Sequence, residues 1–135
     1  MLVTILLGTN DARGAVTAEE YGQNVKLIVE GLLADGVQRV ILIIPPRQFI
    51  GEVEDSEKVH LLAQYRLRLL ELCLAANEEI KCGPDLFMEL GVDDFDPEGV
   101  QRIRVHPNAK GHARIVSALR PMLDIQALRD ARAGE

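Results

Sequence analysis

The amino-acid sequence predicts an α/β domain built on a parallel sheet. Two short apolar runs, residues 2–7 and residues 39–44, have the length and composition of buried strands. A segment with helical periodicity lies between them, at residues 17–34. Strand, helix and strand in this order form a right-handed βαβ unit, in which the two strands are parallel.

The first predicted strand, residues 2–7, carries a single polar side chain, Thr4, and we expect it to be buried on both faces. Gly8 ends this strand, because glycine permits the sharp backbone turn that we expect at residues 8–11. The sequence therefore places a polar turn directly after a buried strand.

A capping box predicts where the first helix begins. The Thr17 hydroxyl can accept a hydrogen bond from a backbone N–H of the first turn, and Glu20 can reach back to the cap. Gly36 stands where a left-handed residue is favoured after a helix. The helix is therefore expected to end near Ala34 or Asp35.

The second predicted strand, residues 39–44, is stopped by Pro45 and Pro46, which have no N–H for a ladder. After it, Ser56 is the predicted N-cap of a second helix. A third strand or extended segment is expected at residues 80–86.

The remaining segments are predicted as two loops and a final helix. Residues 47–55 form a polar, acidic connection, and residues 91–105 form a long loop rich in Asp, Glu and Gly. Asn108 is the predicted N-cap of the final helix, which Pro121 must kink or end.

Length and charge limit the classes of protein to consider. The chain has 135 residues, with 15 Lys and Arg against 21 Asp and Glu, and a formal net charge of −6. We expect one domain over residues 1–128 and a frayed tail at residues 129–135. No apolar run approaches the roughly 20 residues that span a bilayer, and no targeting segment is evident, so we expect a cytoplasmic protein. Net acidity disfavours nucleic acid as a partner.

The cysteines and histidines do not form a metal-binding pattern. Cys73 and Cys82 lack CxxC spacing, and we expect both to be reduced and buried. A metal site built on His106 and His112 would need carboxylate partners that the sequence does not place. Neither a metal nor a cofactor is therefore expected.

The turn after the first strand is the first candidate for chemistry. Gly8, Thr9, Asn10 and Asp11 lie at the carboxyl end of a parallel strand, where open α/β sheets place their ligand sites. The Asn10 amide can donate to a negatively charged oxygen without adding charge. The alternative is a structural Asx turn, in which the Asn and Asp side chains bond the local backbone.

The second candidate is His106, which precedes Pro107 and Asn108 at the entrance to the last helix. A histidine in such a place can act as a general base near neutral pH. The alternative is a solvated loop histidine beside a helix cap. His60 and His112 fall on helical segments, where surface or packing roles are expected.

Three groups of charged residues lie near these segments. Asp93, Asp94 and Asp96 are candidates for orienting a histidine. A basic stretch and an acidic run are both expected to be solvated, although the basic stretch can also attract an anionic substrate. The basic stretch comprises Arg102, Arg104, Lys110 and Arg114, and the acidic run comprises Glu52, Glu54, Asp55 and Glu57.

The order of these features resembles the SGNH (GDSL-type) esterase and lipase superfamily. The resemblance consists of a GxND turn after an apolar strand, a helix, a buried strand ending in Pro-Pro, and His-Pro-Asn-x-x-Gly before a terminal helix. It covers residues 2–122, and residues 3–11 and 40–46 look most like the branch of isoamyl acetate-hydrolysing esterases. It implies a three-layer, flavodoxin-like parallel sheet and hydrolysis of a small carboxylic ester.

The resemblance also implies roles for individual residues. Asn10 matches the side-chain donor of the oxyanion hole, and His106 matches the general base of a Ser-His-Asp arrangement. The family has an Asp three residues before this His, where the chain has Ile103, so Asp96 is the candidate if residues 99–105 loop out. The substrate would contact the remaining turn and cap residues, which are Gly8, Thr9, Asp11 and Asn108.

The sequence departs from the family at the nucleophile. In the family the serine lies in a GDS motif on a strand well before GxND, whereas here Met1 is seven residues before Gly8. Ser56 and Ser117 are predicted at a helix cap and inside the last helix, so neither stands in a strand-to-helix elbow. The resemblance therefore implies an esterase whose nucleophile block is missing from this chain. The alternative is a non-catalytic binding or interaction module of the same fold.

The missing strand would lie beside residues 2–7 and would leave an apolar strand with an open edge. We therefore expect a homodimer, or strand pairing through this edge. A nucleotide- or phosphate-binding function is disfavoured, because residues 8–11 lack the glycine density and the lysine of a phosphate loop.

Overall fold

A three-stranded parallel sheet forms the centre of the fold. The computed structural model describes residues 1–75, 78–123 and 133–134. The strand order is β1 (Leu2–Ile5), β2 (Arg39–Ile44) and β5 (Ile80–Asp85), with β2 in the middle. The predicted α/β class and the parallel pairing of the first two strands are confirmed.

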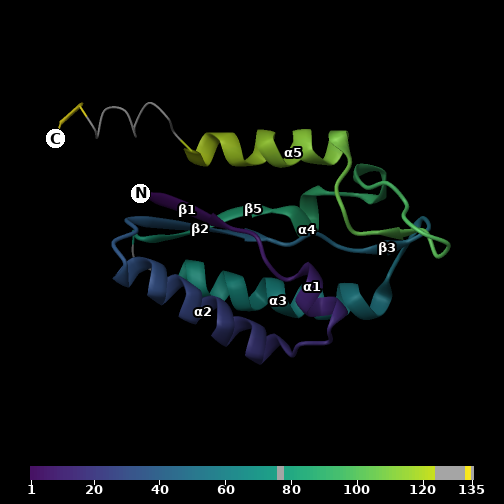
Figure 1. Cartoon of the computed structure of the whole chain (residues 1–135), viewed down its shortest axis with the longest axis horizontal. Coiled ribbons are helices and arrows are strands. Elements are labelled where there is room, and N and C mark those ends of the chain that lie inside the picture. Colours follow the sequence, from purple (N-terminus) through teal and green to yellow (C-terminus); the bar gives the residue numbers. More distant parts are fainter. Residues whose placement is uncertain (76–77, 124–132, 135) are drawn as a thin grey trace.

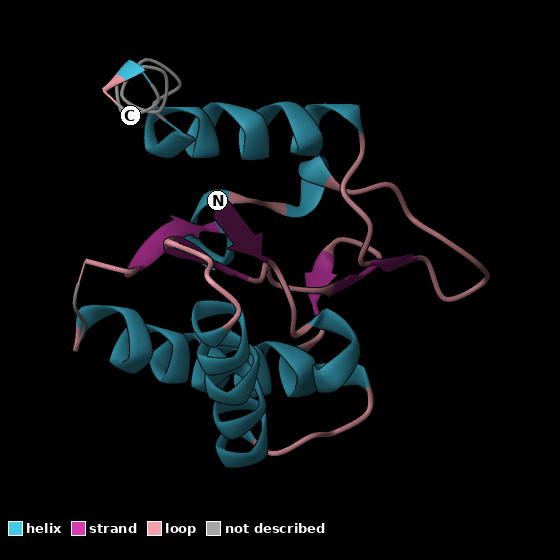
Figure 2. Cartoon of the chain, turned by 60° about the vertical axis from the view of Figure 1, so that its left-hand side comes forward, coloured by secondary structure: helices cyan, strands magenta, loops and turns pink. Residues whose placement is uncertain are grey.

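Helices cover both faces of this sheet (Figure 1, Figure 2). Helices α1 (Thr9–Arg13), α2 (Ala18–Ala34) and α3 (Ser56–Leu74) lie on one face, and α5 (Ala109–Leu119) lies on the other, together with the short α4 (Leu86–Glu89). None of the helices among the described residues is long and apolar enough to cross a membrane.

The central strand supplies side chains to both layers of the core. Val40, Leu42 and Ile44 pack with α2 and α3, and Ile41 and Ile43 pack beneath α5. Successive side chains of a strand point to opposite faces, and helices cover both faces, so all five are buried.

The edge strand β1 differs from its prediction. It spans Leu2–Ile5 rather than residues 2–7, and the side chain of Thr4 is exposed. The next two residues, Leu6 and Leu7, are 43% and 46% exposed. The expectation of burial on both faces was wrong because β1 pairs only with β2 among the described strands and has no neighbour on its other side.

The caps of α2 and α5 are confirmed. Thr17 Oγ1 accepts a hydrogen bond from the Glu20 N–H at 3.2 Å, and α2 ends at Ala34 as expected. Asn108 Oδ1 accepts from the Gly111 N–H at 2.9 Å. After α5, a 3₁₀ turn (η2, Arg120–Leu123) contains Pro121. The expected end of the domain at residue 128 and most of the predicted tail lie outside the described residues.

The cap of α3 is one residue earlier than predicted. Asp55, not Ser56, is the N-cap, and its Oδ1 accepts from the Lys58 N–H at 3.5 Å. Asp and Ser are similarly good caps, so the local sequence does not decide between adjacent candidates. The Asp55 N–H also bonds the Gln48 carbonyl at 2.9 Å, which joins the start of α3 to the preceding hairpin.

A small antiparallel sheet replaces part of the two predicted loops. Its order is β4 (Val53–Glu54), β3 (Phe49–Ile50) and β6 (Ile103–Arg104). Two short helices, α4 (Leu86–Glu89) and η1 (Val92–Asp94), precede β6. Local sequence patterns could not show this sheet, because β3 and β6 are far apart in the chain.

Arg104 is buried rather than solvated, which corrects the prediction for the basic stretch. Its side chain is only 9% exposed. Its guanidinium donates to the carbonyls of Gly51, Val92 and Phe95. Three carbonyl acceptors offset the cost of burying this cation, and they tie β6 to the segments around it.

The two cysteines form a disulfide, so the expectation of reduced thiols was wrong. Cys73, in the last turn of α3, is bonded to Cys82 of β5, with 5.1 Å between the Cα atoms. The residues are nine positions apart, and only the packing of α3 against β5 brings them together. Their spacing alone resembles no metal or redox motif.

Candidate functional site

Gly8 sets the direction of the chain as it leaves β1. Its φ of 130° is unfavourable for any residue with a Cβ. A Cβ there would stand 3.1 Å from Pro45 Cγ and 3.2 Å from the Tyr21 hydroxyl. The structure therefore requires glycine, and α1 begins at the next residue where a turn was predicted.

Two stacked tyrosines hold the segment that contains this turn. The rings of Tyr21 and Tyr65 lie 4.0 Å apart at an angle of 11°. Tyr21 donates to the Leu7 carbonyl at 2.9 Å, and Tyr65 donates to the Val16 carbonyl. Burial raises the pKa of both tyrosines, and the negative charge of Asp11 raises it further. The pKa of Tyr21 lies well above its ordinary value, and the pKa of Tyr65 is about 12. Both hydroxyls therefore remain donors at neutral pH.

The amide of Asn10 is free to bind a ligand. Asn10 is exposed, and its side chain makes no hydrogen bond to the described part of the chain. The structure thus does not form the Asx turn that was the alternative at Asn10. The preceding carbonyl, of Thr9, accepts from Gln48 Nε2 at 3.0 Å, which ties α1 to the segment after β2.

His106 is paired with a carboxylate that the sequence analysis missed. Its Nδ1 lies 2.7 Å from Glu98 Oε2, and its side chain is 78% exposed. No described residue bonds the other ring nitrogen, Nε2. Glu98 and Ile103 exchange backbone hydrogen bonds across a turn at Gly99, and this turn returns Glu98 to the side of His106. Gly99 was the one signal for that reversal in the sequence.

Asp96, the residue expected to orient His106, contacts the helix cap instead. Its Oδ1 accepts from Asn108 Nδ2 at 3.4 Å, and the same amide donates to the Asp93 carbonyl at 3.0 Å. The structure therefore pairs His106 with Glu98 and uses Asp96 at the start of α5.

Asp94 anchors the backbone next to His106. It is 1% exposed, and its Oδ2 accepts from Arg114 at 2.9 Å and from the Gly91 N–H at 2.8 Å. Its carbonyl accepts from the Asn108 N–H, and a Cβ on Gly111 would come within 2.3 Å of that oxygen. Arg114 is therefore part of an ion pair, not of a freely solvated face.

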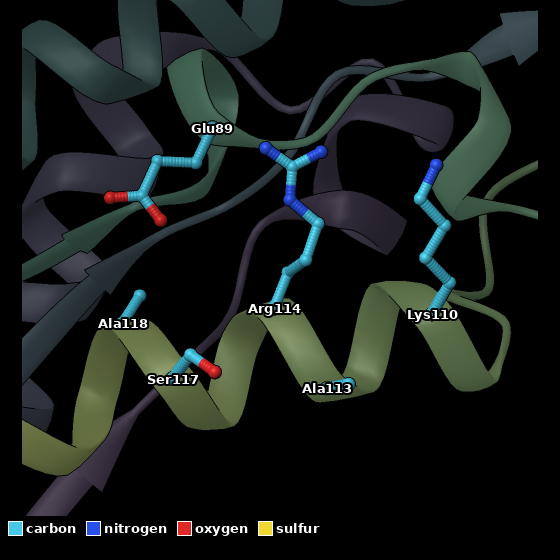
Figure 3. Close-up of a pocket in the computed structure, with 6 residues that line it drawn as sticks. All are labelled: Glu89, Lys110, Ala113, Arg114, Ser117 and Ala118. Carbon is cyan, nitrogen blue, oxygen red and sulfur yellow. The ribbon is translucent and has the colours of Figure 1, made fainter.

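A shallow groove of about 490 Å³ runs along α5 (Figure 3). Figure 3 shows the side chains of Arg114 and Lys110 extending across it from the helix. The groove is lined by Glu89, Lys110, Ala113, Arg114, Ser117 and Ala118. One of its lining residues, Lys110, lies four residues after His106.

Neither serine lies in position to act with His106. Ser117 is roughly 12 Å along the axis of α5 from its first residue, at 1.5 Å per residue. Ser56 is exposed as the first residue of α3. In the described part of the chain, neither hydroxyl is hydrogen-bonded to a histidine nitrogen.

The two candidate segments lie at the same end of the sheet (Figure 1). Thr9 is bonded to Gln48, and the next residue, Phe49, pairs with Arg104 two residues before His106. These contacts connect the carboxyl ends of β1 and β2 to the His106 loop. No described group of three His, Cys, Asp or Glu residues is placed to hold a metal ion.

Comparison of the chain with protein-family models, with curated proteins and with solved structures found no match. Any function must therefore be argued from the chemistry and geometry of these residues.

We predict that Gly8→Ala lowers the free energy of unfolding by about 1–3 kcal/mol, because the new Cβ is strained at this φ and crowds Pro45 and Tyr21. Gly31→Ala is the matched control, since Gly31 lies in α2 and a Cβ added there would have no atom within 4 Å other than those of its chain neighbours and its own helix backbone. That control should be neutral or stabilising by up to about 1 kcal/mol. Urea denaturation measures both, and equal values for the two variants would contradict the role given to Gly8.

We also predict that the protein loses stability in alkali through its tyrosine pair. An unfolded tyrosine releases its proton near pH 10.0, whereas folded Tyr65 holds it to about pH 12. Between these values the unfolded state binds fewer protons than the native state, so the free energy of unfolding falls as pH rises. Tyr65→Phe should show a smaller fall over this window in denaturation curves. Parallel curves for wild type and variant would show that Tyr65 does not titrate in this way.

Proposed function

We propose that the chain carries the general base and an oxyanion donor of an SGNH-type carboxylic ester hydrolase. The observation that carries the proposal is the contact between His106 Nδ1 and Glu98 Oε2 at 2.7 Å. A carboxylate that accepts the Nδ1 proton leaves the lone pair on Nε2, which is the nitrogen that takes a proton from a nucleophile. The exposure of this ring makes Nε2 accessible to such a nucleophile.

Asn10 supports the same function. Its amide is exposed and unbonded within the described chain. Helix α1, which contains Asn10, lies at the same end of the sheet as the start of α5, which follows the His106 segment (Figure 1). An amide N–H donor at this position would stabilise the negative oxygen that forms when an ester carbonyl is attacked. The two tyrosines hold the backbone on either side of Asn10, through the carbonyls of Leu7 and Val16.

The proposed reaction needs a serine from a segment outside these 135 residues. His106 Nε2 would take the serine proton as the serine oxygen attacks the ester carbon, and Asn10 would bond the resulting oxyanion. The alcohol would leave with the proton from His106. A water molecule would then release the acid by the same steps, again with His106 as base.

The open edge of β1 supports the second part of the proposal, that this edge pairs with an added strand. Residues 2–5 carry none of the charges or prolines that usually protect an edge strand. Among the described strands, the order β1-β2-β5 leaves one side of β1 unpaired, so an added strand could extend the sheet into a larger, flavodoxin-like one. The added strand would come from the segment with the serine or from a second copy of the chain.

Hydrolysis of p-nitrophenyl acetate by the protein expressed from its full reading frame tests the catalytic assignment. We expect Asn10→Ala to lower kcat by about 10²–10³-fold and His106→Ala by about 10²–10⁴-fold. His112→Ala is the control, because His112 is exposed on α5 and makes no side-chain bond to the described chain. Equal rates in all variants would exclude the esterase and favour a non-catalytic binding module of the same fold.

Sedimentation of the 135-residue chain tests the edge. We expect association that increases with concentration, and we expect Thr4→Lys to weaken it, because a lysine on an edge strand opposes pairing. Gln23→Lys adds the same charge on the exposed surface of α2 and should leave association unchanged. A monomer at every concentration would contradict pairing between copies.

A further inference from the structure

A second concave site lies on the face of the sheet covered by α2 and α3. It is a cleft of about 230 Å³, more enclosed than the groove on α5. Val29 and Leu42, which are 3% and 1% exposed, are its most deeply buried lining residues. The cleft is lined by Lys26, Val29, Glu30, Leu33, Leu42, Leu72 and Ile80. None of these residues belongs to the site around His106.

The lining of this cleft is suited to an apolar ligand. Among the described residues that line it, five of the seven side chains are aliphatic. The other two, Lys26 and Glu30, face each other at 3.8 Å and are more than half exposed, so they form a solvated rim. The buried polar side-chain atoms that lack partners lie elsewhere in the described chain, on Arg47, Asp85 and Asp94. A polar ligand would lose its hydration here without gaining hydrogen bonds.

The size of the cleft sets the size of the ligand. Apolar protein cavities of roughly 150 Å³ lined by aliphatic side chains stay dry and accept benzene. A volume of about 230 Å³ exceeds that value. It is sufficient for a compact hydrocarbon group with roughly six to eight carbon atoms.

The disulfide lies across two walls of the cleft. Cys73 directly follows the lining residue Leu72 on α3, and Cys82 lies two residues after the lining residue Ile80 on β5. The bond therefore links the two elements that carry these walls. A fixed wall spacing reduces the ordering cost of ligand binding.

We propose that this cleft binds a small apolar molecule, and that the Cys73–Cys82 disulfide holds its walls in the binding geometry. The proposal concerns a site separate from the His106 region and does not depend on the esterase assignment.

Titration of benzene into the methyl-labelled chain, followed by NMR, tests the proposal. We expect saturable shifts of the Leu33, Leu42 and Ile80 methyl signals, with a Kd on the order of 1 mM for this six-carbon probe. The absence of saturable shifts, or shifts confined to other residues, would overturn the site. This measurement uses the wild-type chain and does not depend on any variant being folded.

A pair of variants tests the location independently. Leu33→Phe places a ring in the cleft and should weaken benzene binding at least tenfold. Leu27→Phe is the matched control, because Leu27 is 66% exposed on the same helix and does not line the cleft. An unchanged Kd in Leu33→Phe, with circular dichroism showing a native fold, would overturn the assignment.

Reduction tests the role of the disulfide. With the bond reduced by a phosphine, we expect the Kd for benzene to rise severalfold while the methyl signals still report a folded chain. An unchanged Kd after complete reduction would overturn the role of the disulfide and leave the cleft as a redox-independent site.

Discussion

The burial of β2 on both faces is the constraint on which the rest of the structure depends. Its five apolar side chains alternate between the two layers of the core, and each contributes on the order of 1.5–3 kcal/mol. Because both faces of β2 are buried, helices pack above and below the sheet. The backbone N–H and C=O groups of β2 are then out of reach of water, and β1 and β5 supply their hydrogen-bond partners on either side. Where β2 ends, Pro45 occupies the space that a Cβ on Gly8 would need, and Gln48 donates a hydrogen bond to the Thr9 carbonyl. The position of the candidate site therefore follows from where this strand stops.

The two halves of the candidate site combine a fixed backbone with exposed functional groups. The Asn10 half is held from below by the stacked tyrosines, whose hydroxyls bond backbone carbonyls. The His106 half is held by Arg104 and by the buried Asp94. Burying a carboxylate is costly, and the ion pair to Arg114 together with the Gly91 N–H offsets much of that cost. Such buried polar contacts fix the backbone and leave Asn10 and His106 facing solvent.

Elements that depend on local patterns could be predicted from the sequence. Thr17 and Asn108 cap their helices as expected, and β2 has its predicted bounds, because caps and apolar runs are local signals. The resemblance to the esterase family pointed to Asn10 and His106, and both side chains are exposed. Whether they act in ester hydrolysis stays a prediction.

Features that depend on non-local contacts could not be predicted. Pairing between β3 and β6, the disulfide, and the contact of Glu98 with His106 all need the chain to return on itself. The exposure of Leu6 and Leu7 reflects the position of β1 at the edge, which local composition does not reveal. An apolar run thus indicates a strand but not whether both of its sides are covered.

A strand added at the open edge of β1 would also bring residues close to Asn10. This consequence distinguishes the two proposed occupants of the edge, which are the segment with the serine and a second copy of the chain. Strands in a sheet lie roughly 4.8 Å apart, and parallel neighbours end at the same side. A parallel strand beside β1 would therefore deliver the residues after it next to Gly8 and Asn10, where the proposed reaction needs a serine. Two copies of β1 paired antiparallel would instead place the end of one beside the start of the other. Antiparallel pairing between copies would thus cover the edge without completing the site, so only a parallel added strand joins the two parts of the proposed function.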